Sequence, residues 1–283
     1  MSRQEPPSIL LIGEREHGEF EAAVAWLRNS VALLTCDNIV AVEAMLKKPG
    51  AKLPDWLVFL AGYRGAFAND DVERLHKCVP LARLVTLLGS WCEGETRSGR
   101  SLPGIARVYW HQWPTRAPAE LLGERAGRYA GWSLPRTATP LDVSLLARPV
   151  GNAWSSDSLA NTAELAIIAP TRERFLTLAD AVGACGLKST WHRASVSQLS
   201  AATTGVLVGG ESLTEAMEQM IVATVDASAG RPVVLMLDFP RWQEVDRARQ
   251  LGVTGVLSKP YLLGDLRSIL VPCLSKGDRI AAA

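Results

Sequence analysis

Short apolar runs alternate along this chain with segments in which apolar residues recur at helical spacing. Continuous runs are typical of parallel strands buried on both faces, and helical spacing is typical of helices that cover a sheet. In the first half we predict strands at Ile9–Ile12, Val31–Thr35, Trp56–Gly62, Ala82–Leu88 and Ile105–Trp110. In the second half we predict strands at Leu165–Ala169, Leu187–Trp191, Gly205–Val208, Val233–Leu237 and Val256–Leu257. The pattern predicts an α/β protein with two doubly wound parallel-sheet domains in tandem.

Length and composition agree with two folded domains. The chain has 283 residues, of which 48% are apolar and 21% charged, and each half is long enough to bury its own core. We expect a first domain at 1–115, a linker at 116–162, a second domain at 163–276 and a flexible tail at 277–283. The linker prediction follows from its Pro, Ser, Gly, Arg and Trp content, and it includes one short helix near Glu120–Tyr129.

The end of the second half carries the most specific motif. Residues 251–266, LGVTGVLSKPYLLGDL, place Lys259 and Pro260 directly after the last predicted strand. This segment resembles the end of the receiver domain of two-component response regulators, in which a lysine followed by a cis proline contacts the phosphorylated aspartate. The resemblance implies a flavodoxin-like fold, and the repeated strand pattern extends that expectation to the first half.

Neither half carries the residues with which a receiver domain accepts a phosphoryl group. That chemistry needs an acidic pair after the first strand to hold Mg²⁺ and a nucleophilic aspartate after the third. In the first half these places hold Glu14 alone and Leu60–Gly62. In the second half they hold residues 169–172, APTR, and Gly209–Gly210. The resemblance therefore implies a tandem of degenerate receiver domains that work without aspartyl phosphorylation.

Two charged residues at the end of the second half are candidate anion or ligand contacts. Lys259 and Asp238 follow neighbouring predicted strands, at the edge where doubly wound sheets bind ligands. Lys259 could neutralise a bound anion, or it could serve only the turn that it makes with Pro260. Asp238 could be a displaced functional acid or the partner of Lys259 in an ordinary ion pair.

The loop after the fourth strand of the first half is the candidate interaction loop. Its candidate contacts are Trp91, Cys92, Glu93, Glu95, Arg97 and Arg100. Charged residues and a cysteine on a loop at the carboxyl edge of a sheet are well placed for a site, and the loop also resembles one in receiver-like proteins of planctomycete bacteria. Internal pairing of the loop charges is the alternative explanation. A nucleophilic role for Cys92 lacks an obvious base beside it in the sequence.

Arginine and aromatic residues interleave from Thr96 to Arg136. The candidate interface residues in this stretch are Trp110, Trp113, Arg116 and Trp132. Such side chains can stack on nucleic-acid bases, and they are also enriched at protein interfaces. Because the net charge of the whole chain is only +1, nucleic acid is disfavoured, and we predict an interface within the chain or with a protein partner.

The remaining signals predict no cofactor, metal or membrane contact. The cysteines are scattered, with no CxxC spacing, at Cys36, Cys78, Cys92, Cys185 and Cys273. Together with an N-terminus that has no signal-peptide core, this pattern predicts a cytoplasmic protein with reduced thiols. The histidines are dispersed, and the phosphate-binding loop and nucleophile-turn motifs are absent from the sequence.

We therefore expect a non-enzymatic signal-transduction protein, a pseudo-response regulator that acts through a protein partner or a second copy of itself. The alternative is a sensor that binds a small molecule or nucleotide at the carboxyl edge of the second domain's sheet, near Gly209–Gly210 and Lys259.

Overall fold

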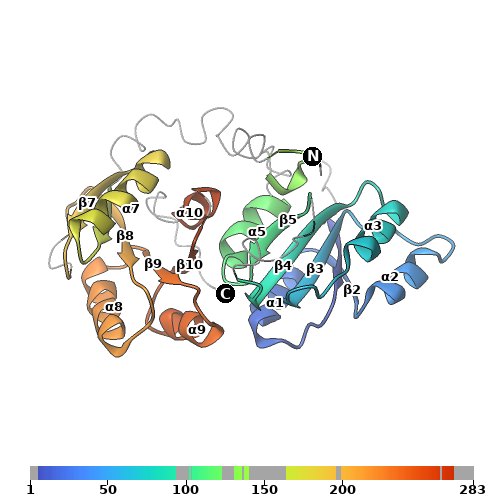
Figure 1. Ribbon diagram of the computed structural model, residues 1–283, viewed down its shortest axis with the longest axis horizontal. Coiled ribbons are helices and arrows are strands. Elements are labelled where there is room, and N and C mark those ends of the chain that lie inside the picture. The colour runs from blue at the N-terminus through green and yellow to red at the C-terminus, as the bar shows by residue number, and fades with distance from the viewer. Residues whose placement is uncertain are drawn as a thin grey trace. The chain divides into compact units, whose positions relative to one another are not determined.

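The computed structural model describes residues 6–93, 102, 104–122, 131–135, 137–139, 164–195, 199–261 and 263–270. The chain divides into two compact units, Met1–Arg148 and Pro149–Ala283, and each is described by itself. Each unit holds a five-stranded sheet whose strands pair in parallel (Figure 1). The predicted class, two doubly wound α/β domains, is confirmed.

The sheet of the first unit has the strand order β2-β1-β3-β4-β5. Its strands are β1 (Ser8–Ile12), β2 (Ala32–Cys36), β3 (Trp56–Tyr63), β4 (Arg83–Trp91) and β5 (Ala106–Tyr109). The helices are η1 (Gly18–Phe20), α1 (Glu21–Ser30), α2 (Ile39–Leu46), α3 (Asn69–Cys78), α5 (Trp113–Leu122) and η3 (Gly131–Ser133). Helices α1 and α5 cover one face of the sheet, and α2 and α3 cover the other (Figure 1).

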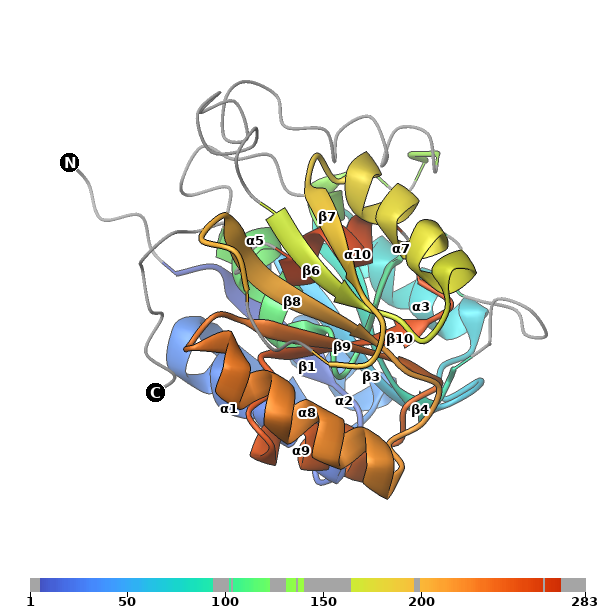
Figure 2. The ribbon, with the colours of Figure 1, turned by 90° about the vertical axis from the view of Figure 1, so that its left-hand side faces the viewer.

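The sheet of the second unit has the order β10-β9-β8-β6-β7. Its strands are β6 (Glu164–Ile168), β7 (Lys188–His192), β8 (Thr203–Gly209), β9 (Val233–Asp238) and β10 (Gly255–Lys259). The helices are α7 (Arg172–Ala184), α8 (Glu215–Ser228), α9 (Trp242–Gln250) and α10 (Leu263–Leu270). Figure 2 shows α7 and α10 on one side of this sheet and α8 and α9 on the other.

Both sheets therefore share the flavodoxin-like order 2-1-3-4-5, counted from the first strand of each unit. In that order the second strand lies on one side of the first strand, and the third strand lies on the other side of it. The loops after the first and third strands consequently diverge above the carboxyl edge of the sheet, which opens a crevice between them.

The inner strands form where the sequence predicts them because their apolar runs are buried on both faces. All residues of β1 are buried, and β9 is buried from Val233 to Leu237. Strand β2 lies at the edge of its sheet and is correspondingly half-exposed. Helix α2 is capped at its start by Asn38, whose side chain accepts a hydrogen bond from the amide of Ala41 at 2.9 Å.

Helix α5 differs from the predicted linker helix. It begins at Trp113 and ends at Leu122, so it crosses the expected boundary at 115/116 and starts before the predicted Glu120. Trp113 is fully buried, with its ring 6.4 Å from that of Trp26 on α1. The stretch lacks the long apolar run of a core helix, and it buries the spaced side chains of Trp113, Ala117 and Leu121. Helix α5 is thus part of the first unit's fold.

The predicted interface residues all lie inside this unit. The rings of Trp110, Trp113 and Trp132 are at most 4% exposed, and those of Trp113 and Trp132 are 5.7 Å apart. The guanidinium of Arg116 lies 5.4 Å from the centre of the Trp132 ring, a cation–π arrangement. These side chains therefore contact one another within the chain. An interface within the chain was one of the two predicted alternatives, and the other was an interface with a protein partner.

Candidate functional site

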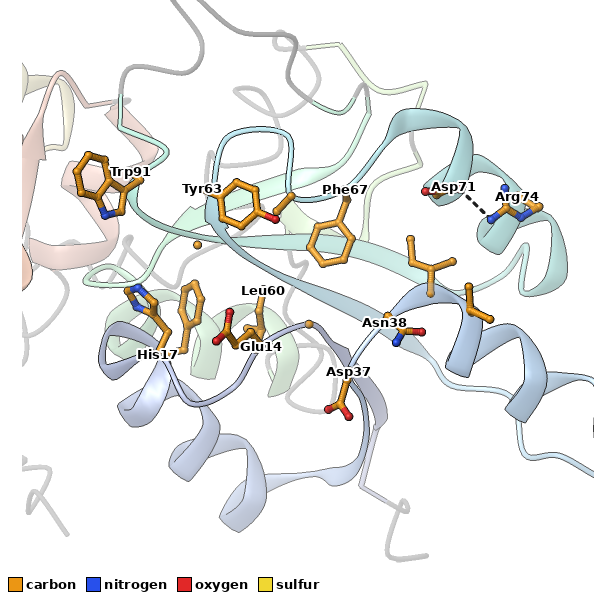
Figure 3. A pocket seen from close by; sticks show the side chains of 16 residues that line it. Glu14, His17, Asp37, Asn38, Leu60, Tyr63, Phe67, Asp71, Arg74 and Trp91 are labelled. Atoms are coloured by element: carbon orange, nitrogen blue, oxygen red, sulfur yellow. Dashed lines mark ion pairs between the residues drawn. The ribbon is translucent and has the colours of Figure 1, made fainter.

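A pocket of about 650 Å³ opens at the carboxyl edge of the first unit's sheet (Figure 3). We call it the edge pocket. It is lined by Gly13, Glu14, His17, Phe20, Asp37, Asn38, Ile39, Val40, Leu60, Gly62, Tyr63, Ala66, Phe67, Asp71, Arg74 and Trp91. These residues lie at the carboxyl ends of the strands β1, β2, β3 and β4 and on the segments that follow β1, β2 and β3, so the pocket occupies the crevice that this strand order creates. Its volume is within the range typical of small-ligand sites.

Gly13 lies at the base of the edge pocket, directly after β1. Its φ angle is +118°, and a Cβ atom there would lie 2.9 Å from the carbonyl oxygen of Leu60 and 3.2 Å from the ring of Phe67. Its amide donates to the carbonyl of Cys36 at 3.0 Å. Only glycine allows the chain to leave β1 so close to β3, and this close approach sets the depth of the pocket.

A buried carboxylate fixes the loop that forms one wall. Glu19, 6% exposed, accepts hydrogen bonds from the amide of Ser90 at 2.9 Å and from the hydroxyl of Ser90. A Cβ atom on Gly89 would lie 2.5 Å from this carboxylate and 3.1 Å from the carbonyl oxygen of Gly62. Glycine at position 89 thus lets the loop after β1 be joined to the end of β4.

Aromatic side chains stand around the opening of the edge pocket. Tyr63 is 63% exposed and Trp91 is 75% exposed, although both are large amphipathic rings. Phe67 is held from behind by Phe59, with ring centres 5.2 Å apart in an edge-on arrangement. Figure 3 shows Tyr63, Phe67 and Trp91 along one side of the pocket, across from Glu14 and His17.

The charged groups of the edge pocket are mostly acidic, and its arginine is already paired. Arg74 lies 2.5 Å from Glu43 and 2.8 Å from Asp71. Hydrogen bonds first to Glu43 and then to Asp71 raise the pKa of Arg74. Asp37 is paired with Arg15 at 2.6 Å.

Glu14 is the acid of the pocket without such compensation. It is exposed and has no ion-pair partner among the residues that the structure describes. The pocket therefore carries an excess of negative charge around aromatic rings.

The edge pocket contains the positions at which the resemblance to receiver domains would place phosphorylation chemistry. The residues directly after β1 are Gly13 and Glu14, and the end of β3 holds Leu60–Gly62. Leu60 and Ala61 are buried, 3% and 6% exposed. Within the described part of the chain, His, Cys, Asp and Glu side chains do not gather in groups of three that could hold a metal ion.

The start of the candidate interaction loop turns inward after Trp91. Cys92 is 1% exposed, and its thiol donates to the carbonyl oxygen of Ala61 at 3.2 Å, so it is not placed to attack a ligand from solvent. The carboxylate of Glu93 lies 3.3 Å from the buried ring of His111. Glu95, Arg97 and Arg100 lie outside the described residues.

At the carboxyl edge of the second sheet, the lysine and the aspartate pair with each other. The ammonium of Lys259 lies 2.7 Å from Asp238, because the two residues are register partners on β10 and β9. The peptide bond between Lys259 and Pro260 is cis, as the resemblance implies. A Cβ on Gly210 would lie 2.5 Å from the end of the Met217 side chain, so side chains already fill the space beside this glycine.

Residue-by-residue prediction missed most of the edge pocket. Trp91 was a candidate, but His17, Tyr63 and Phe67 were not. They belong to loops that are distant in sequence, and only the strand order brings those loops together. The available signal was topological, because the crevice between the loops after the first and third strands follows from the 2-1-3-4-5 order.

Comparisons with known proteins leave the family of this chain open. No protein-family model matches the sequence, and no curated protein matches it. The chain is similar in structure to a putative pilus assembly-related protein from Burkholderia pseudomallei, with 18% identity, a TM-score of 0.35, and coverage of 41% of this chain and 91% of that one.

Two further structures match with weaker scores. The GsuK channel has 11% identity and a TM-score of 0.31, with coverage of 96% of this chain and 64% of that one. A putative D-3-phosphoglycerate dehydrogenase from Ralstonia solanacearum has 11% identity and a TM-score of 0.25, with coverage of 90% and 82%. These TM-scores are too low to carry an argument about function.

Among the helices in the described part of the chain, none combines the length and the apolar character that crossing a bilayer requires.

Proposed function

We propose that this chain is a non-enzymatic signalling protein, built from two receiver-like domains, that acts by contacting another protein without being phosphorylated on aspartate. One observation carries the proposal. Where a receiver domain holds its acceptor and metal-binding acids, the first unit has glycine and buried apolar residues below two exposed aromatic side chains, Tyr63 and Trp91.

Exposed tyrosine and tryptophan side chains beside the edge pocket are typical of a surface that binds another protein. These two residue types are enriched among the side chains that dominate binding energy at interfaces. Exposing such large rings to water does not stabilise the fold, so their exposure indicates an interaction site. We infer that the carboxyl edge of the first unit, around Tyr63 and Trp91, is the contact surface.

The proposal includes a cytoplasmic setting, because the scattered cysteines of the sequence predict no disulfide framework.

The experiment is quantitative affinity capture from a lysate of the source organism with three forms of the chain. The forms are the wild type, the double variant Tyr63→Ala/Trp91→Ala, and the control Leu81→Ala. Leu81 is 95% exposed and precedes β4, at the opposite edge of the same sheet. We expect a partner that the wild type and the control retain and that the double variant loses. Capture that is equal for all three forms would contradict the proposed surface.

A ligand sensor is the second candidate function, and the volume of the edge pocket favours it. At the second sheet, where the sequence suggested such a site, the ion pair of Lys259 with Asp238 would have to open to admit an anion. A thermal-shift screen separates the candidates, because a sensor is stabilised by a saturating small molecule and a pure contact protein is not.

A further inference from the structure

The edge pocket combines two features that together select for positive charge. Aromatic faces attract cations through the negative potential above the ring, and the pocket offers Tyr63, Phe67 and Trp91. Carboxylates complete such a site when they can approach the same cation. The chain also has an uncompensated acid, Glu14, on the loop that faces these rings (Figure 3).

Three acidic residues line the pocket. The positions of Asp37 and Asp71 are explained by nearby helices and arginines, and the position of Glu14 is not. Asp37 precedes α2, and Asp71 lies in the first turn of α3, where a carboxylate is stabilised by the helix dipole. Each is also paired with an arginine, Arg15 or Arg74. Glu14 follows a strand, starts no helix and has no ion-pair partner in the described part of the chain.

The same charges disfavour an anionic ligand. A phosphate or carboxylate would meet Glu14, Asp37 and Asp71 without an unpaired arginine to receive it, because Arg74 is bound to two acids. Anion sites at this edge of doubly wound folds depend on the amide groups at a helix start. In this pocket the start of α2 is already capped by Asn38.

We propose that the edge pocket receives a guanidinium group, presented by an arginine side chain of the protein partner. This inference rests on the proposed function, since the cation comes from a protein. Arginine fits better than lysine because its planar, weakly hydrated group stacks on Trp91 or Tyr63 while its N–H groups reach a carboxylate such as Glu14. The partner's arginine thus occupies the space where a receiver domain would hold its phosphoryl group and Mg²⁺.

The test is a titration of the whole isotope-labelled chain with the capped tripeptide acetyl-Gly-Arg-Gly-amide, followed by nuclear magnetic resonance. The reporters are the indole signal of Trp91 and the amide signals of Gly13 and Gly62, which line the pocket. The matched probe carries citrulline, a neutral isostere, in place of arginine. We expect saturable shifts at the reporters with the arginine peptide, and binding at least about fivefold weaker with the citrulline peptide.

Two variants and a control locate the effect. Trp91→Ala should lower the affinity for the arginine peptide about fivefold, and Glu14→Gln should lower it about threefold. Both side chains are exposed, so neither change threatens the fold. Asp226→Asn removes one exposed charge from the second unit and should leave the affinity unchanged. Equal binding of the two peptides, or shifts confined to other surfaces, would overturn the proposal.

A further arm separates the two sources of an organic cation. Benzylammonium tests whether the pocket serves a free amine. Binding of benzylammonium without binding of the arginine peptide would overturn the assignment to a protein side chain.

Failure of this inference can be told from failure of the proposed function. Capture of the partner that depends on Tyr63 and Trp91 but is unchanged by Glu14→Gln would sustain the function and reject the arginine. Loss of capture with Glu14→Gln supports both.

Discussion

Gly89 and Glu19 form a tightly constrained contact beside the edge pocket. The carboxylate of Glu19 reaches Ser90 across the space that a side chain at position 89 would occupy. The carboxylate is buried and accepts two hydrogen bonds, so moving it leaves donors unsatisfied. One glycine and one glutamate, far apart in sequence, thus hold the loop after β1 against the end of β4.

Gly89→Ala should destabilise the first unit by about 2–4 kcal/mol, since the new methyl group displaces a hydrogen-bonded carboxylate and presses on the backbone of Gly62. Gly183→Ala is the matched control, because Gly183 lies in α7 with open space around it. That change should stabilise the second unit by about 0.5–1 kcal/mol. Denaturant unfolding of both variants checks the prediction, and a Gly89→Ala protein as stable as the wild type would contradict it.

Glu120 makes the stability of the first unit depend on pH. Burial raises the pKa of its carboxyl from 4.5, against the lowering effects of Arg116 and of the backbone N–H groups of Trp132 and Gly131. The folded state then binds this proton more tightly than the unfolded state does. Its contribution to stability is complete below about pH 4.5 and is lost as the pH rises through the raised value.

Glu120→Gln should therefore become more favourable relative to the wild type as the pH rises from 4 to 8, because glutamine stays neutral and still accepts the amide of Trp132, which lies 2.8 Å from Glu120. Thermal unfolding of both proteins across this pH range checks the sign. A variant whose disadvantage grows toward pH 8 would show that the charged carboxylate stabilises the fold.

At the scale of the element, α5 extends the first domain past the boundary expected from the sequence. Trp113 lies between α1 and η3, in ring contact with Trp26 and Trp132. The helix therefore occupies the place of the closing helix of a doubly wound domain.

Trp113→Ala should cost the first unit about 3–5 kcal/mol, the usual range for emptying a fully buried aromatic site. The control is Trp91→Ala, the same change at a ring that is 75% exposed, which should alter stability by less than about 0.5 kcal/mol. Hydrogen exchange followed peptide by peptide separates the two units, and exchange should accelerate in β1–β5 of the Trp113 variant but not in β6–β10. Equal protection in both variants would mean that α5 is dispensable.

The elements also show what local sequence can and cannot predict. Buried strands such as β1 and β9 were predictable because apolar runs determine them almost alone. The cis peptide at Pro260 was implied by a motif of neighbouring residues. By contrast, α5 contains Pro118 and buries the spaced side chains of Trp113, Ala117 and Leu121, so composition alone favoured a linker. The edge pocket could not be predicted from neighbouring residues, because it depends on which loops the strand order brings together.

At the scale of the whole molecule, two units share one strand order but differ at their carboxyl edges. The first unit has an open pocket with exposed aromatic rings. The second unit pairs its lysine and aspartate, and side chains pack beside Gly210. A fold of this kind hosts many activities, so we base the proposed function on these edges and not on the strand order.

The most direct test of the central proposal is the intact mass of the chain after incubation with acetyl phosphate and Mg²⁺. Our account predicts no added phosphoryl group and no Mg²⁺-dependent stabilisation by beryllofluoride, because a carboxylate acceptor is missing from the ends of β3 and β8. A gain of one phosphoryl group that disappears when a single acid is replaced, with Glu14→Gln as the first variant to try, would contradict it. The chain would then be a phosphorylated switch, and the edge pocket its active site.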